Sequence, residues 1–293
     1  MKTEDMQSAV VLLGTKGGPA IRPGGPMPTS TLVQMSGLTL LVDAGLGVAQ
    51  AIGAAGLPLT ALDAVLITHL HSDHVLELGP LLHTAWTGGL QHEIPIFGPP
   101  GIETYWQGFL GAMEYDIALR EEDEGRPPFH ELFSIGHLSD MRPIDLEGVL
   151  VSALRNDHPP VEHSFALKLE HGGDTLVLSG DTAPMPGMIA FARDADLLVH
   201  EAMLPEGVQA IVERMGTGDN RLLEHILRSH SPADEVGRIA AGAGVKALAL
   251  NHLIPSGDPD ITEAHWRAAV EPSYGGPLHV GRDGMVIAFG TGA

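Results

Sequence analysis

Four short apolar segments of this chain each end in a histidine or an aspartate. One of them, residues 64–68 (AVLIT), leads directly into His69. Wholly apolar runs of this length are typical of strands buried on both faces, and here they alternate with segments of helical pattern. The pattern predicts an α/β protein with its site beyond the strand ends, where such folds build their functional loops. The residues that end the other three segments are Asp181, His200 and His252.

The expected elements follow this alternation along the whole chain. We expect one domain over residues 1–293, made of two similar halves, roughly 1–148 and 149–293. Residues 14–29 are too rich in glycine and proline for regular structure, and residues 120–128 are expected to form a solvated connector. Helices are expected at residues 46–56, 77–87, 102–119 and 232–243. Strands are expected at residues 8–13, 31–34, 39–43, 64–68, 94–97, 149–153, 164–170, 175–179, 197–199 and 247–250.

The composition excludes several classes of site and partner. The 293 residues include no cysteine, which excludes disulfides, thiolate zinc sites and a cysteine nucleophile. The formal net charge of −21 argues against nucleic acid and anionic membranes as partners, because Lys and Arg supply most of such binding. Residues 1–5 carry no signal-peptide pattern, and no apolar run is long enough to span a membrane. We therefore expect a cytoplasmic protein.

The strongest chemical signal is the sequence HLHSDH at residues 69–74. Imidazole and carboxylate groups are ligands that zinc and similar divalent ions accept. Two residues apart on an extended segment, His69 and His71 can face one side. Asp73 and His74 lie where the chain turns into the next helix, so they can face a second position. Two metal ions therefore suit this segment better than one, and its place after a buried strand makes a histidine-rich surface loop the weaker interpretation.

The order H-x-H-x-D-H resembles the metal-binding motif of the metallo-β-lactamase superfamily, and the resemblance covers most of the chain. It implies a four-layer αββα sandwich with a dinuclear metal site at one edge between the sheets. Residues 41–45 (LVDAG), which contain Asp43, are similar to an early strand-end motif of the family. The ligands that the resemblance implies are His69, His71 and His158 for the first metal, Asp73, His74 and His252 for the second, and Asp181 as the bridge.

Two further motifs resemble the tRNase Z-like branch of this superfamily. Residues 200–202 (HEA) are similar to its His-Glu-Ala motif, and residues 229–231 (SHS) to its His-Ser motif. The resemblance implies that His230 protonates the leaving group and that Glu201 holds its ring, a pairing that raises the basicity of an imidazole. A buried polar network without chemistry is the alternative. Arylsulfatase-like members of the branch have similar glycine-rich loops.

We predict a dinuclear metal-dependent hydrolase that cleaves an ester-type bond of a small molecule, namely an aryl sulfate, phosphoester, carboxyl ester or lactone. The implied nucleophile is a hydroxide held between two divalent ions, with zinc preferred and manganese, iron or cobalt as alternatives. The acidic charge and the lack of a basic protruding arm set this function above a phosphodiesterase or ribonuclease Z-like nuclease acting on nucleotides or RNA ends. A metal-binding regulatory protein that retains the fold is the non-enzyme alternative. The resemblance also implies a homodimer.

Catalytic, supporting and substrate-contacting residues complete the prediction. As a ligand, His158 is preferred over His163, because His158 precedes the expected strand whereas His163 adjoins its start. The candidate catalytic residues are Asp73, Glu201 and His230. The residues expected to support the ligands are Asp43 and His200. The candidates for contact with substrate are His163, His83 and Trp86.

Overall fold

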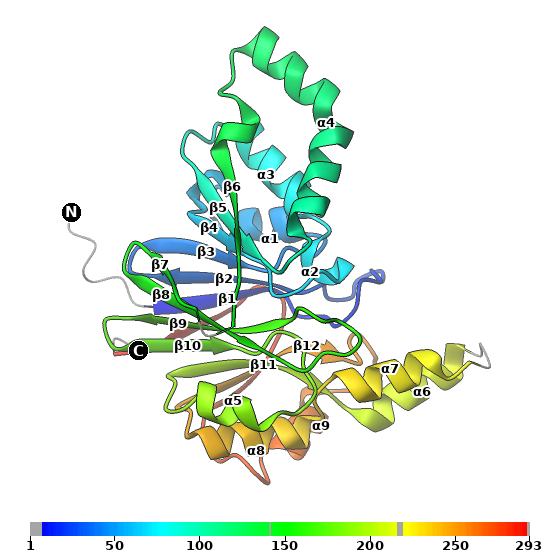
Figure 1. The fold of residues 1–293 in the computed structure, drawn as a ribbon. Coiled ribbons are helices and arrows are strands. Elements are labelled where there is room, and N and C mark those ends of the chain that lie inside the picture. Colours follow the sequence, from blue (N-terminus) through cyan, green and yellow to red (C-terminus); the bar gives the residue numbers. More distant parts are fainter. Residues whose placement is uncertain (1–7, 141, 216–218, 292–293) are drawn as a thin grey trace.

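Two seven-stranded sheets lie face to face at the centre of the computed structural model (Figure 1). The structure describes residues 8–140, 142–215 and 219–291, so residues 1–5, where no signal peptide is expected, lie outside the described residues. Helices cover the outer face of each sheet. The molecule therefore has the αββα layers that the family resemblance implies.

The first sheet joins the early strands of the chain to the last one. Its strands are β1 (Ser8–Gly14), β2 (Ser30–Met35), β3 (Leu38–Val42), β4 (Ala64–Leu66), β5 (Ile94–Gly98), β6 (Phe133–His137) and β14 (Met285–Phe289). Their order in the sheet is β14-β1-β2-β3-β4-β5-β6, antiparallel up to β3 and parallel beyond it. The helices on its outer face are α1 (Val48–Ala54), α3 (Leu78–Thr87) and α4 (Ile102–Glu124).

The second sheet contains β7 (Ile144–Leu146), β8 (Val149–Arg155), β9 (Phe165–His171), β10 (Asp174–Leu178), β11 (Leu197–Met203), β12 (Leu248–Ile254) and β13 (Leu278–Val280). Their order is β13-β12-β11-β10-β9-β8-β7, with parallel pairing from β10 to β13. The helices on its outer face are α5 (Pro186–Phe191), α8 (Ala233–Ala243) and α9 (Glu263–Val270). The remaining elements are α2 (Ser72–Val75), α6 (Pro205–Met215), α7 (Arg221–Ser229) and two short 3-10 turns, Leu59–Ala61 and Phe129–Leu132.

Alternate side chains of the strands enter different apolar layers. In β3, Leu41 packs under the helices, whereas Leu40 and Val42 face the second sheet. In β4, Val65 and Leu66 divide between the same two layers. Burial on both faces explains why these strands are continuous apolar runs in the sequence.

Helix α4 is longer than the sequence analysis predicts. Its last residue is Glu124, so the solvated connector expected at residues 120–128 is wrong over its first half. Arg120 forms ion pairs with Asp116 and Glu124, one helical turn away on either side, and such pairs support a helix without any apolar pattern. The helix ends at Gly125, whose positive φ of 63° is typical of a C-terminal cap. Within the described residues, no helix is both long and apolar enough to cross a membrane.

The two sheets do not divide the chain at residue 148. Strand β7 already belongs to the second sheet, and β14 returns to the first, where Phe289 lies opposite Ser8. The chain therefore crosses between the sheets twice. This crossing supports the expectation of one domain, which stays a proposal.

Candidate metal centre

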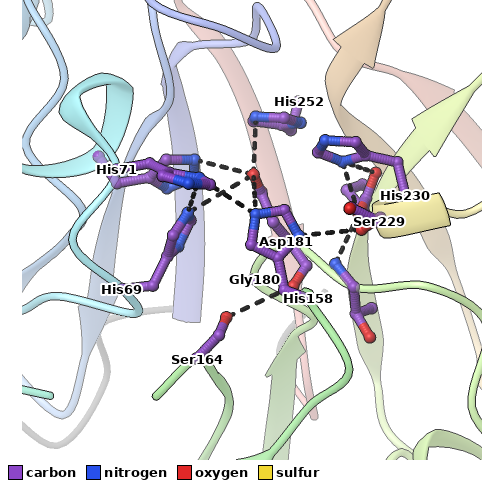
Figure 2. Close-up of polar contacts among 12 residues, drawn as sticks. His69, His71, His158, Ser164, Gly180, Asp181, Ser229, His230 and His252 are labelled. Carbon is purple, nitrogen blue, oxygen red and sulfur yellow. Dashed lines mark hydrogen bonds and ion pairs between the residues drawn. The ribbon is translucent and has the colours of Figure 1, made fainter. Parts of the chain in front are cut away.

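The carboxylate of Asp181 lies at the meeting point of histidines from both sheets (Figure 2). Its Oδ2 atom is 3.0 Å from Nε2 of His252, 3.2 Å from Nε2 of His74, 3.7 Å from Nε2 of His69 and 3.9 Å from Nε2 of His158. All five side chains are buried. This arrangement matches a carboxylate shared between two ligand groups.

The first ligand group consists of His69, His71 and His158 together with Asp181. Nδ1 of His71 lies 3.1 Å from Nε2 of His69 and 3.1 Å from Nε2 of His158. Burial lowers the pKa of the His69 imidazole, and it lowers that of His158 to about 4, although Asp181 opposes both shifts. These rings are therefore neutral near pH 7 and present lone pairs toward a common point.

The second ligand group consists of Asp73, His74 and His252, again with Asp181. Oδ2 of Asp73 lies 3.3 Å from Nε2 of His252 and 3.7 Å from Nε2 of His74. Nε2 of His74 and Oδ1 of Asp181 are buried and have no hydrogen-bond partner among the described residues. Because an unpaired buried polar atom is costly, and imidazole and carboxylate suit zinc-like ions, both groups fit divalent cations.

The backbone is strained at two residues of this site. Asp43 follows β3 with a φ of 62°, and His252 lies within β12 with a φ of 43°. Strand pairing also shifts register between Glu201 and Ala202, where β11 lies beside β12. Left-handed backbone is uncommon for residues other than glycine, although Asp and His adopt it more readily than most, and it is often retained at functional sites. Here the local distortion coincides with the point at which His252 enters the cluster.

Hydrogen bonds behind the cluster fix which ring nitrogen faces it. Nδ1 of His74 donates to Oδ2 of Asp43 at 2.7 Å, and Asp43 in turn accepts from the Thr68 amide at 2.8 Å. Nδ1 of His158 donates to the carbonyl of Ser229 at 2.9 Å. Each contact leaves Nε2 as the free lone-pair donor, as in histidines that bind metals. Asp43 therefore lies in the supporting position predicted for it.

The glycine-rich segment at residues 14–29 reaches the cluster. The Gly18 amide donates to Oδ2 of Asp73 at 2.8 Å. The buried Lys16 ammonium donates to the carbonyls of Gly17 and Gly18 and so holds this turn in place. The segment is thus one rim of the site.

His230 and Glu201 form a buried pair next to the second ligand group. Nδ1 of His230 lies 3.0 Å from both carboxylate oxygens of Glu201, which also accepts the Thr182 amide at 2.6 Å. The His230 ring stacks on His252, with centroids 5.3 Å apart. Burial opposes protonation of His230, but the Glu201 carboxylate outweighs it and raises the pKa of the imidazole to about 9. His230 therefore holds two protons at neutral pH and can donate one.

His200 lies behind this pair. Its Nδ1 donates to the backbone carbonyl of Glu201 at 2.7 Å, and burial lowers its pKa to about 4. The neutral ring packs in the interior and belongs to none of the metal-ligand groups. It therefore supports the backbone of Glu201, and its expected role in supporting the ligands stays a prediction.

Comparison with known proteins identifies relatives over almost the whole chain. A family model described as "Anti-Pycsar protein Apyc1" matches residues 10–244. A protein named ribonuclease Z from Mycolicibacterium paratuberculosis is 35% identical over 280 residues, which are 94% of this chain and 95% of that protein. The chain belongs to the Apyc1 family, within the tRNase Z-like branch of the metallo-β-lactamase superfamily. It is therefore a metal-dependent hydrolase.

Solved structures of the superfamily share the fold of this tRNase Z-like chain. The metallo-β-lactamase fold protein YhfI from Bacillus subtilis matches with a TM-score of 0.71 at 23% identity, over 97% of this chain and 100% of that one. The short form of human tRNase Z matches with a TM-score of 0.67 at 20% identity, over 96% and 99% of the two chains. These matches agree with the αββα sandwich described above.

The relatives correct the predicted partners of the chain. From the net charge of −21 the sequence analysis expects a small-molecule substrate and argues against nucleic acid; this expectation is wrong, because relatives that are 35% identical to the chain are named ribonuclease Z. Net charge sums the whole surface, whereas the potential at a site depends on groups within about 10 Å, the screening distance at ordinary ionic strength. The relatives likewise give no support to the arylsulfatase and esterase functions.

The three residues predicted to contact substrate belong to neither ligand group and do not line the pocket beside the cluster. Nε2 of His83 forms a hydrogen bond with Oδ2 of Asp116 on α4, at 2.9 Å. The rings of His83 and Trp86 pack against each other and against Phe129. Their one-turn spacing therefore reflects packing of α3. His163 is partly exposed and belongs to neither ligand group. The residue that the sequence analysis missed is His225 on α7, which lines the pocket beside the cluster; its spacing of one helical turn from Ser229 was the available signal.

Substitution of His158 and His163 distinguishes the two candidate ligands. We expect His158→Ala to lose about one metal ion per chain, because it removes one of three neutral imidazoles from the first group. His163→Ala keeps the wild-type metal content. Metal analysis by mass spectrometry on dialysed protein makes the comparison, and the opposite pattern would reject His158 as a ligand.

Proposed function

We propose that this chain is a two-metal phosphodiesterase that hydrolyses phosphodiester bonds of RNA or nucleotides. The observation that carries the proposal is the Glu201–His230 pair stacked on His252, because it places a proton donor beside the second ligand group. Relatives named ribonuclease Z support the bond type.

Two divalent ions, zinc by the chemistry of the ligands, would be held by the two groups that share Asp181. His69, His71 and His158 would hold one ion. Asp73, His74 and His252 would hold the other. When bound, such a pair activates water and stabilises the charge that develops on a phosphoryl group.

The protein supplies the proton for the leaving group. Nδ1 of His230 donates its proton in a hydrogen bond to Glu201. The transferable proton is therefore the one on Nε2, and the ring lines the pocket. The pKa of about 9 keeps that nitrogen protonated before the reaction. As the P–O bond breaks, the leaving oxygen takes this proton, and Glu201 keeps the ring oriented. General acid catalysis thus needs no further side chain.

A panel of substrates tests the proposal. The metal-loaded protein should hydrolyse bis(4-nitrophenyl) phosphate and shorten single-stranded RNA, and it should leave 4-nitrophenyl acetate and 4-nitrophenyl sulfate intact. Both diesters present the phosphoryl group that the metals stabilise and an oxygen that His230 can protonate. Hydrolysis of the carboxyl or sulfate ester in the absence of diester cleavage would overturn the proposal.

A further inference from the structure

One wall of the pocket beside the cluster has no assigned role. The pocket has a volume of about 270 Å³, and its floor is formed by His71, Asp73, Asp181, His230 and His252. Its other lining residues are Gly17, Gly18, Pro19, Ser72, Leu222, His225, Ile226 and Ile254. Three of these come from α7, which projects from the body together with α6 (Figure 1).

The spacing along α7 explains why three of its residues reach the pocket. His225 and Ile226 follow Leu222 by three and four positions, and Ser229 follows His225 by four. All four residues therefore lie on one face of the helix. Leu222 is 46% exposed, which is high for a leucine next to a polar cluster. The face is open to a ligand.

His225 stands above the cluster. Its ring centroid is 6.2 Å from that of His71, 6.3 Å from that of His158 and 6.4 Å from that of His230. Its Nδ1 lies 3.5 Å from Oγ of Ser229, a long contact, and no partner for its Nε2 occurs among the described residues. In the tautomer with its proton on Nε2, this ring can donate a hydrogen bond to a phosphoryl group bound in the pocket that it lines.

The other two α7 side chains that line the pocket are apolar. Leu222 and Ile226 face the pocket together with Ile254 from β12. Small-molecule pockets usually measure about 300–1,000 Å³, so a volume of about 270 Å³ is of the size that suits one nucleotide. Apolar side chains suit the flat face of a base, whereas a hydrogen-bond donor suits the phosphate.

We propose that α7 is the substrate-binding wall of the enzyme. His225 donates a hydrogen bond to a non-bridging oxygen of the phosphodiester, and Leu222 and Ile226 pack against the single nucleoside next to it. This inference rests on the proposed phosphodiesterase function. It identifies a nucleoside, rather than any aryl or alkyl group, as the recognised part of the substrate.

The chain contains a matched control for Leu222. Leu227 lies on the same helix, is 44% exposed and does not line the pocket. We expect Leu222→Ala to raise KM about tenfold for thymidine 5′-(4-nitrophenyl phosphate), with little change in kcat. Leu227→Ala should behave as wild type. Neither variant should change KM for methyl 4-nitrophenyl phosphate, which has the same leaving group and no nucleoside.

Substitution of His225 tests the phosphate contact. His225→Ala should lower kcat/KM for both diesters by about 10–100-fold, the usual loss for a hydrogen bond to a charged group. His225→Gln, which keeps an N–H donor, should recover part of the loss. Both variants should retain the metal content of wild type, and a loss of metal would place His225 among the ligands and overturn the inference.

Binding separates failure of this inference from failure of the proposed function. Wild-type protein should bind thymidine 5′-monophosphate more tightly than Leu222→Ala or His225→Ala does, as measured by calorimetry. If wild type cleaves diesters but both variants match it in KM and binding, α7 is not the wall and the function stands. If wild type cleaves no diester, the proposed phosphodiesterase function is wrong. If, in addition, all three proteins bind thymidine 5′-monophosphate equally or not at all, α7 is not the substrate-binding wall either.

Discussion

Replacing Asp181 with asparagine will lower diester hydrolysis by more than 100-fold and remove about one metal ion per chain, because loss of an outer partner alone costs roughly 10–100-fold. Asp181 is the residue shared by both ligand groups, with Oδ2 3.0 Å from His252 and 3.2 Å from His74. The amide of asparagine is neutral, and its oxygen is a weaker metal ligand than a carboxylate oxygen. It can therefore neither bridge two cations nor offset their charge.

Substitutions of two other aspartates serve as an intermediate case and as a control for this experiment. Asp43→Asn weakens the hydrogen bonds from His74 and Thr68 but removes no predicted ligand, so it should lower activity by about 10–100-fold and reduce metal affinity to a smaller extent. Asp123→Asn changes an exposed residue of α4 and should match wild type. Activity should rank wild type and Asp123→Asn above Asp43→Asn, and Asp43→Asn above Asp181→Asn. A fully metal-loaded, active Asp181→Asn protein would disprove the bridging role.

The cluster could be predicted from the sequence because its residues follow strands. His69 lies three residues beyond the end of β4, Asp181 lies three residues beyond the end of β10, and His252 lies in β12. Parallel strands bring their carboxyl ends to one edge, so local pattern and sheet topology agree at these positions. That these residues bind metal stays a prediction, but the structure brings together the residues that the resemblance implies.

Other features depend on contacts that no local pattern reveals. Strand β14 pairs with β1 across almost the whole chain, and the Gly18 amide meets Asp73 only after the glycine-rich segment folds back. His225 was not assigned because one imidazole on an amphipathic helix is usually a surface residue. The acidic composition misled because charge counted along a sequence gives no position in space. All of these features depend on contacts between segments that are distant in the sequence, and local sequence patterns therefore do not predict them.

Replacing His230 with alanine will slow cleavage of diesters that have poor leaving groups by about 10²–10⁴-fold, the usual contribution of a general acid. RNA has such a leaving group, since a sugar alkoxide needs a proton as it departs. Nitrophenolate leaves without one, so bis(4-nitrophenyl) phosphate should lose far less activity. Metal content should remain that of wild type, because His230 belongs to neither of the groups around Asp181.

Glu201→Gln should change the pH dependence of the same reaction in a defined direction. The acid form of His230 is the active one, so the rate with RNA falls as pH rises through the pKa of this imidazole. The carboxylate of Glu201 raises that pKa to about 9 against the effect of burial, and the neutral amide cannot. The alkaline limb of kcat/KM should therefore move to lower pH in Glu201→Gln and disappear in His230→Ala. The opposite result would be an alkaline limb that is unchanged in both variants, with activity reduced equally for RNA and for nitrophenyl diesters. It would show that the Glu201–His230 pair is structural and that another group protonates the leaving oxygen.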